Sequence, residues 1–126
     1  MSRITASASA ILAAVALAGC SPATKTASTG TATPEITVNA SDTGCTVSTT
    51  KAAAGSYTFV VTNTGTKVTE FYVYGDGERV LAEAENISPG LQRRLDVRFD
   101  KAGTYKTACK PGMAGDGIRG DFTVTG

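Results

Sequence analysis

The chain has 126 residues, enough for one domain, and its 12 basic and 11 acidic residues leave a formal net charge of +1. Because the charges are so nearly balanced, no basic patch indicates nucleic-acid binding. The sequence contains no histidine, which excludes a Ser-His-Asp or Cys-His nucleophile, and we do not expect an enzyme.

The first twenty residues have the features of a targeting segment. Arg3 supplies a positive start, and residues 10–17 form an apolar run that is too short to span a bilayer as a mature helix. The segment closes with Leu17-Ala18-Gly19-Cys20, which resembles a bacterial lipobox. We therefore predict a lipoprotein signal peptide over 1–19 and lipidation of Cys20, which would anchor the protein on the extracytoplasmic face of the cell membrane. The alternative is a soluble secreted protein.

Residues 20–34 are predicted to carry the lipid and to form a flexible spacer. From Ser21 onward they are small or polar and include no large apolar residue. Such a segment cannot bury enough surface to offset the entropy lost on ordering. We expect it to hold a folded domain, residues 35–126, away from the membrane.

The domain has the pattern of short strands separated by turns. Ile36 and Val38 alternate with polar residues, and the strongest strand signal covers residues 57–62. Seven or eight strands with regular turn signals predict an all-β fold, an antiparallel Greek-key β-sandwich, and we expect a monomer. Further strands are predicted over residues 45–49, 70–74, 91–99, 103–109 and 121–125, a loop over 51–55, and either a helix or a strand over 78–87.

The strand over residues 103–109 ends in a glycine-rich loop, with a thiol at the junction. Tyr105 and Cys109 fall on one face of this strand because side chains alternate with period two. Pro111 cannot donate to a ladder, so strand pairing should stop just past the cysteine. A sulfur ligand at a strand end, followed by the thioether of Met113, is one way to build a metal site on a rigid base.

This strand and loop resemble the C-terminal part of cupredoxins. Cys109 stands at the position of the copper-ligating cysteine, and Pro111-Gly112 at the following Pro-Gly pair. Met113 and Glu70, however, stand where that family has its two histidine ligands. Because a blue-copper centre needs two His and one Cys, no blue-copper centre is expected.

Three stretches taken together look like the cupredoxin-like domain of EfeO-type bacterial iron-uptake proteins. They are residues 67–72, 84–91 and 107–113, which occur in that family's order. The resemblance covers residues 35–125 and implies a cupredoxin-like fold in an extracytoplasmic protein. In that family the domain commonly precedes a helical imelysin-like domain, which this sequence does not contain.

With Cys20 assigned to the lipid, Cys45 and Cys109 remain as an even pair in an oxidising compartment. The cupredoxin resemblance implies that these two residues lie near each other. Either they form a disulfide, worth roughly 3–5 kcal/mol in the chain-entropy model, or they supply two thiolates to a metal site with Glu70 and Met113. The sequence does not supply the geometry that a disulfide needs, so both interpretations stay open.

Each of the other metal candidates also has an ordinary structural interpretation. Glu70 could be a solvent-facing carboxylate, Met113 could fill one end of the sandwich, and Asp116 could serve only as a turn residue rather than as a weaker oxygen donor. Thiolates and a thioether favour cuprous copper, whereas a carboxylate shifts the preference towards ferric iron. The predicted metal is therefore copper or iron, with the candidate ligands Cys109, Glu70, Cys45, Met113 and Asp116.

The predicted function is a membrane-anchored extracytoplasmic protein that binds a transition metal and assists metal uptake or electron transfer. Iron-uptake proteins of the cell envelope are the partners that the resemblance implies. The alternative is a metal-free, disulfide-stapled β-sandwich that binds another envelope protein.

Overall fold

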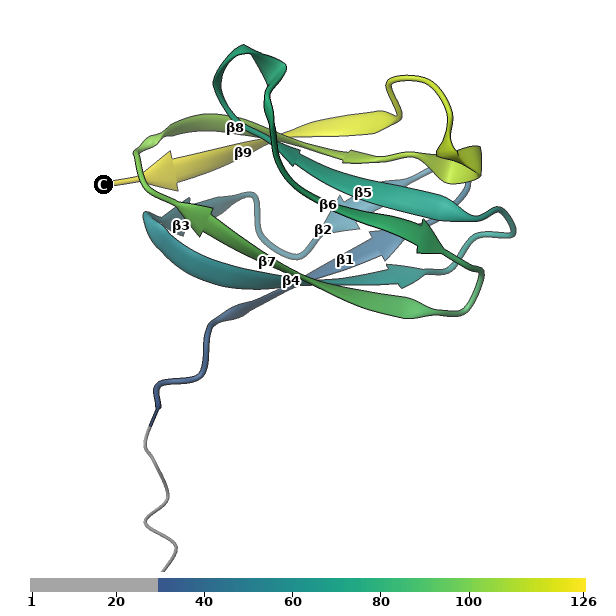
Figure 1. Ribbon diagram of the computed structural model, residues 1–126, viewed down its shortest axis with the longest axis horizontal. Coiled ribbons are helices and arrows are strands. Elements are labelled where there is room, and N and C mark those ends of the chain that lie inside the picture. Colours follow the sequence, from purple (N-terminus) through teal and green to yellow (C-terminus); the bar gives the residue numbers. More distant parts are fainter. Residues whose placement is uncertain (1–29) are drawn as a thin grey trace, which may run out of the picture. The chain divides into compact units, whose positions relative to one another are not determined.

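Residues 30–126, which the computed structural model describes, form two β-sheets that face each other (Figure 1). The predicted signal peptide over 1–19, the predicted lipidation site Cys20 and the predicted spacer up to residue 29 lie outside the described residues. One sheet has the strand order β2-β1-β4-β7, with bounds β1 (Glu35–Ala40), β2 (Cys45–Val47), β4 (Gly55–Asn63) and β7 (Gln92–Phe99). The other has the order β3-β9-β8-β5-β6, with bounds β3 (Lys51–Ala53), β5 (Thr69–Tyr74), β6 (Val80–Ile87), β8 (Gly103–Cys109) and β9 (Ile118–Thr125).

The core forms between the sheets from side chains that alternate along the strands. In β1 every second residue is buried, as expected for a strand with one face on the core. Phe59 lies at the centre, with its ring centroid 5.5 Å from that of Phe71, 6.4 Å from that of Phe99 and 5.7 Å from that of Phe122. These rings come from both sheets, so aromatic packing holds the sheets together.

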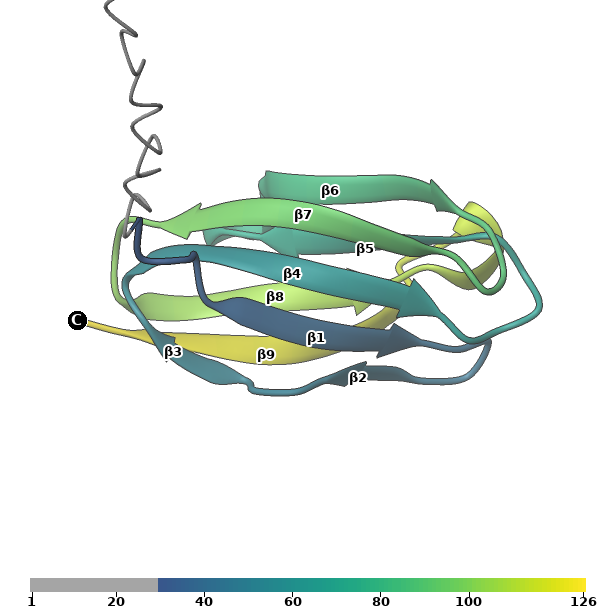
Figure 2. The same ribbon diagram turned by 90° about the horizontal axis from the view of Figure 1, so that it is seen from below.

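The all-β sandwich predicted from the sequence is confirmed, but the sheets are mixed rather than purely antiparallel. β1 runs parallel to β4, and β3 runs parallel to β9. β2 returns antiparallel to β1, and the chain then continues through β3 in the other sheet. Since β2 and β3 together make one return pass, β4 starts in the same direction as β1 (Figure 2).

One local prediction was wrong, and one that was left open is now decided. Residues 51–55 are not a loop, because Lys51–Ala53 form the edge strand β3, which pairs with the distant β9. The ambiguous segment 78–87 is a strand from Val80 onward and pairs with β5, so tertiary pairing overrides its helix-favouring composition. Asp76–Glu78 before it form a short 3-10 turn, and β9 begins three residues earlier than predicted, at Ile118.

The turns at one end of the sandwich, which we call the loop end, are the segments 41–44, 64–68, 88–91 and 110–117. Register places them together, because Ala40 pairs with both Cys45 and Asn63. At the opposite end, which we call the far end, Gly103 pairs with Val124, near the close of β9. The chain therefore enters β1 and leaves β9 at the far end (Figure 2).

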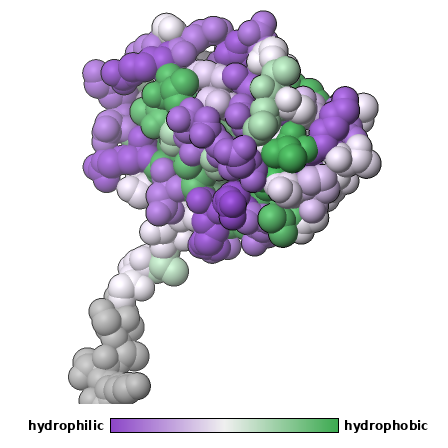
Figure 3. Space-filling view, turned by 45° about the vertical axis from the view of Figure 1, so that its right-hand side comes forward, coloured by the Kyte–Doolittle hydropathy of each residue, from purple (hydrophilic) through white to green (hydrophobic). Residues whose placement is uncertain are grey.

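The face of the domain that Figure 3 shows is mainly polar. On the face shown in Figure 3, hydrophilic residues predominate and hydrophobic residues form separate patches. Among the described residues, no helix has the length and apolar character needed to cross a membrane.

Candidate functional site at the loop end

A disulfide joins Cys45 to Cys109 at the loop end, with the two Sγ atoms 2.00 Å apart. Cys45 begins β2 in the four-stranded sheet and Cys109 ends β8 in the five-stranded sheet, so the bond links the two sheets. Cys109 is fully buried, whereas Cys45 is partly buried at the margin of the core. Of the two interpretations of this pair, the structure contains the oxidised one, in which neither sulfur is a thiolate.

Glu70 pairs with Lys110, the residue after Cys109, and its side chain lies on the opposite face of the sheet from that of Cys109. Phe71 is the residue opposite Cys109, and both are buried in the core. Because side chains alternate along a strand, Glu70 points outward. Its carboxylate accepts a hydrogen bond from the Tyr72 hydroxyl at 3.1 Å, so it makes a contact on the outer surface rather than with the cysteines.

Met113 and Asp116 lie in the loop that joins β8 to β9. β8 ends at Cys109, Lys110 still pairs with Glu70 through backbone hydrogen bonds, and a 3-10 turn over Pro111–Met113 follows, as the proline predicts. The Gly112 N–H donates to the Val68 carbonyl at 2.7 Å, which fixes this loop on the neighbouring turn. The Met113 side chain is 43% exposed and Asp116 is also exposed, so neither is enclosed by the loop end.

A buried amide, which the sequence analysis did not identify as important, connects the turn 64–68 to the end of β6. Asn63 is 1% exposed, and its Nδ2 donates at 2.8 Å to the carbonyls of both Lys67 and Ile87. Its Oδ1 accepts from the Gly65 N–H at 2.9 Å. The only sequence signal was the turn-forming Asn-Thr-Gly triplet, which does not reveal a buried role.

The carboxylate of Asp42, which lies in the turn between β1 and β2, also holds the turn 64–68 in place. Asp42 accepts hydrogen bonds from the Thr66 hydroxyl at 2.6 Å and from the backbone N–H groups of Thr66 and Lys67 at 3.0–3.1 Å. The hydrogen bonds from Thr66 hold the pKa of Asp42 below its usual value of 3.8. Together, Asp42 and Asn63 make the loop end a rigid, hydrogen-bonded frame around the disulfide.

The outer face of the five-stranded sheet carries a stacked tyrosine pair that was also missed. The rings of Tyr72 and Tyr74 are 5.6 Å apart with an interplanar angle of 9°, and they bury Ala108 beneath them. The Lys110 Nζ lies 4.2 Å from the centre of the Tyr72 ring, and the Arg119 guanidinium lies 4.9 Å from that of Tyr74. These cation–π contacts cover the rings, so the pair forms a small second core on the sheet surface.

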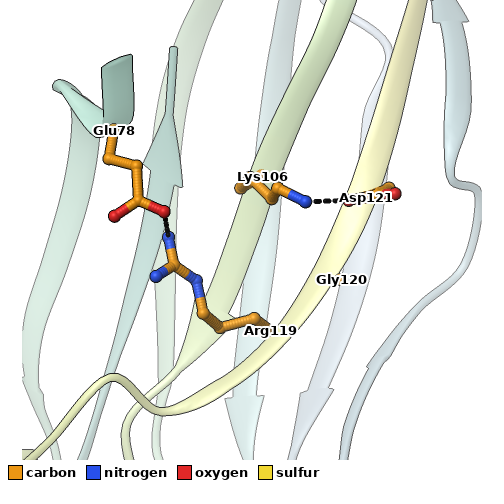
Figure 4. A pocket seen from close by; sticks show the side chains of 5 residues that line it. All are labelled: Glu78, Lys106, Arg119, Gly120 and Asp121. Carbon is orange, nitrogen blue, oxygen red and sulfur yellow. Dashed lines mark hydrogen bonds and ion pairs between the residues drawn. The ribbon is translucent and has the colours of Figure 1, made fainter. Parts of the chain in front are cut away.

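Beside this pair is a shallow pocket of about 250 Å³, drawn in Figure 4. Arg119 forms an ion pair with Glu78, and Lys106 forms one with Asp121 (Figure 4). Each cation in the pocket is already matched by a carboxylate, so the lining has no excess charge to select an ionic ligand.

A resident blue copper does not fit this site. The chain has no histidine, and the sulfur at the copper-ligand position is held in a disulfide. Within residues 30–126, no three His, Cys, Asp or Glu side chains group closely enough to hold a metal ion. The five sequence-derived candidates therefore separate into one joined pair, Cys45 and Cys109, and three residues with other surroundings.

We predict that Gly117 is the most demanding position of the loop that covers Cys109. Its φ is +76°, and a Cβ there would lie 2.6 Å from the Cys109 carbonyl oxygen. Gly117→Ala should lower the free energy of unfolding by about 2 kcal/mol or more, since the left-handed backbone alone costs about 1–2 kcal/mol. Gly115→Ala is the matched control, because its φ is +70° but a Cβ would meet nothing within 4 Å. Urea unfolding of both variants measures the difference, and equal losses would contradict the contact argument.

A second prediction concerns the ionisation of Tyr72. Burial has the largest effect on the pKa of Tyr72, and the hydrogen bond to Glu70 has the next largest. Together they raise this pKa from 10.0 to about 12. Because the folded-state pKa is raised, its stabilising contribution is present below pH 10 and is lost as the pH rises from 10 to about 12. Glu70→Gln should lower the pKa, as read from the ultraviolet absorbance of the phenolate, and Tyr72→Phe should remove that titration. An unchanged titration in Glu70→Gln, with Glu35→Gln as the remote control, would refute the assigned cause.

The two sheets, the final strand-loop-strand unit and the cysteine at its first strand end define a cupredoxin-type sandwich. In this protein, a disulfide-bonded cysteine and a methionine stand at positions where the cupredoxin resemblance implies copper ligands. The chain belongs to the cupredoxin-like domain family, whose pattern matches residues 9–124. The fold class inferred from the sequence is thereby confirmed, whereas the narrower EfeO-type assignment stays a prediction.

Solved structures with a similar fold include several auracyanins. Auracyanin B aligns with a TM-score of 0.59 and 18% identity over 74% of this chain and 89% of its own. Reduced auracyanin from Roseiflexus castenholzii gives 0.55 and 17% over 75% and 97%. Auracyanin A from Chloroflexus aurantiacus, described as a blue copper protein, gives 0.51 and 16% over 72% and 99%. At these identities the similarity establishes the fold alone, and no curated protein sequence matches.

Proposed function

We propose that this protein is a disulfide-stapled, cupredoxin-like binding module of the cell envelope, held at the membrane by a lipid on Cys20 and acting as a monomer without catalysis. The observation that carries the proposal is the Cys45–Cys109 disulfide, which occupies the sulfur at the copper-ligand position. The lack of histidine in the whole sequence supports it.

The loop end is the surface that we assign to binding another envelope protein. Its turns are fixed by the hydrogen bonds of Asn63 and Asp42, so little ordering entropy would be lost on association. Leu91 and Met113, which are 49% and 43% exposed, supply apolar contact area on two of these turns.

A second candidate function is metal binding by the reduced protein. The structure brings the sulfurs of Cys45 and Cys109 together, so reduction would create two adjacent thiols at a strand end. With Met113 in the next turn, such a set suits cuprous copper, and Glu70 or Asp116 would be needed to favour iron. Assistance to an EfeO-type iron-uptake system belongs to this second candidate.

One experiment separates the two candidates: a free-thiol titration of the protein as isolated from the envelope, with bound metal measured by mass spectrometry on the same sample. No free thiol and no copper or iron supports the stapled module. Thiols that become titratable only after metal removal, with stoichiometric copper or iron, would overturn it in favour of the metal site. The Cys45→Ser/Cys109→Ser variant is the control for metal held elsewhere.

A further inference from the structure

We propose that Cys45 is a site of S-thiolation: a thiol attacks the disulfide at the sulfur of Cys45 and releases Cys109 into the core. The inference goes beyond the proposed function, because it assigns a modification site and a direction to the opening of the disulfide. It depends on the unequal surroundings of the two cysteines.

The first asymmetry is burial. Cys109 has no exposed surface and is enclosed on both sides, since β8 pairs with β5 and with β9. Cys45 is partly exposed and begins β2, an edge strand of three residues that pairs only with β1. The rate of thiol–disulfide exchange depends on access to the attacked sulfur.

The second asymmetry is the direction of approach. A thiolate attacks a disulfide sulfur from the side opposite the departing sulfur. Since Cys109 belongs to the five-stranded sheet, attack on Cys45 comes from the side of the four-stranded sheet, whose edge strand β2 carries Cys45. Attack on Cys109 would come through the five-stranded sheet, where Phe71 is the paired residue and Gly117 lies against the Cys109 backbone.

The part of the protein that must open to admit a thiol is also smaller for attack on Cys45 than for attack on Cys109. Three register pairs with β1 hold β2, together with the turn bond from the Ser41 N–H to the Gly44 carbonyl. Fraying of a short edge strand is a local event, whereas exposing Cys109 needs separation of central strands and approaches global unfolding. Burial disfavours the departing Cys109 thiolate and slows the favoured route, whereas attack on Cys109 first requires the core to open, at a cost that approaches the free energy of global unfolding.

Thiol–disulfide exchange at Cys45 takes place in two steps. The incoming thiolate forms an S–S bond to Cys45 while the Cys45–Cys109 bond breaks, and the Cys109 sulfur leaves with the electron pair and takes a proton from solvent. A second thiolate that attacks the mixed disulfide frees Cys45 and leaves the small thiol as its own disulfide. The protein gains two electrons, and two thiols are oxidised.

Glutathione is the probe for the direct test on the full-length protein. Brief exposure, an acid quench and alkylation in denaturant preserve the adduct, and trypsin separates Cys45 on residues 26–51 from Cys109 on residues 107–119. We expect the glutathione adduct on Cys45 to exceed that on Cys109 by roughly tenfold or more, given the difference between local and global opening. An adduct mainly on Cys109, equal adducts, or no adduct while the protein stays folded would each overturn the proposal.

A kinetic test with a folded variant addresses the opening of β2 directly. The Thr37 N–H donates to the Ser48 hydroxyl at 3.0 Å, just beyond the end of β2. Ser48→Ala should speed the appearance of the Cys45 adduct by about fivefold, the value of one net hydrogen bond. Thr123→Ala, an exposed position on β9, is the matched control and should leave the rate unchanged. Equal rates in the two variants would show that the β2 edge does not control access.

Discussion

Replacing both Cys45 and Cys109 by serine should lower the free energy of unfolding by about 4 kcal/mol. The disulfide closes a loop with a sequence separation of 64 residues, and in the chain-entropy model a loop of that length corresponds to about 4 kcal/mol. The staple matters in a small domain, where the whole free energy of unfolding is of the order of 5–15 kcal/mol. Urea unfolding of the double variant and of the oxidised wild-type protein measures the effect.

The reduced wild-type protein is the control that separates the covalent bond from changes in packing. It retains both sulfur atoms, so its midpoint should fall with that of the double variant rather than with that of the oxidised protein. A double variant as stable as the oxidised protein would mean that the loop-end hydrogen bonds alone hold β2 in place.

Phe59→Ala should cost about 3–5 kcal/mol, the range for a large buried aromatic side chain. Phe59 is fully buried and contacts rings from both sheets, those of Phe71 and Phe122 among them. Its removal leaves a cavity between the sheets that neighbouring rings can fill only in part. Chemical denaturation gives the free energy, and near-ultraviolet circular dichroism reports the loss of aromatic packing.

Ser56→Ala on the same strand is the matched control for this core variant. Ser56 is exposed, and its replacement should change stability by less than about 0.5 kcal/mol. A Phe59→Ala protein as stable as this control would contradict the placement of Phe59 at the centre of the core.

The alternating strands and the end of β8 were predictable because their signals are local. Alternation in β1 marks the buried face, and Pro111 marks the end of pairing, whereas in β4 residues 58–61 are all buried. β3 and the parallel pairs were not predictable. β3 forms because Lys51–Ala53 pair with residues 123–125. No local sequence pattern encodes a partner so distant in sequence.

The candidate site shows the same division. The family resemblance implied that Cys45 and Cys109 lie close together, which the structure shows. The resemblance did not reveal that Glu70 faces away from the two cysteines. A match to a ligand position does not show which groups the carboxylate contacts, and here it accepts a hydrogen bond from Tyr72. The stacked tyrosines had a usable signal: β5 is apolar on both faces, with Phe71 and Val73 on one and Tyr72 and Tyr74 on the other, and a second apolar face needs cover.

The chain enters β1 and leaves β9 at the same end of the domain, the far end. From Glu35 the six residues of β1 lead the chain about 20 Å towards the loop end, so the disulfide lies about one strand length from the point where the chain enters the domain. The C-terminal Gly126 follows β9 at the same far end (Figure 1). A protein fused or immobilised through its C-terminus would therefore present the loop end, with the Cys45–Cys109 disulfide, on the side away from the attachment.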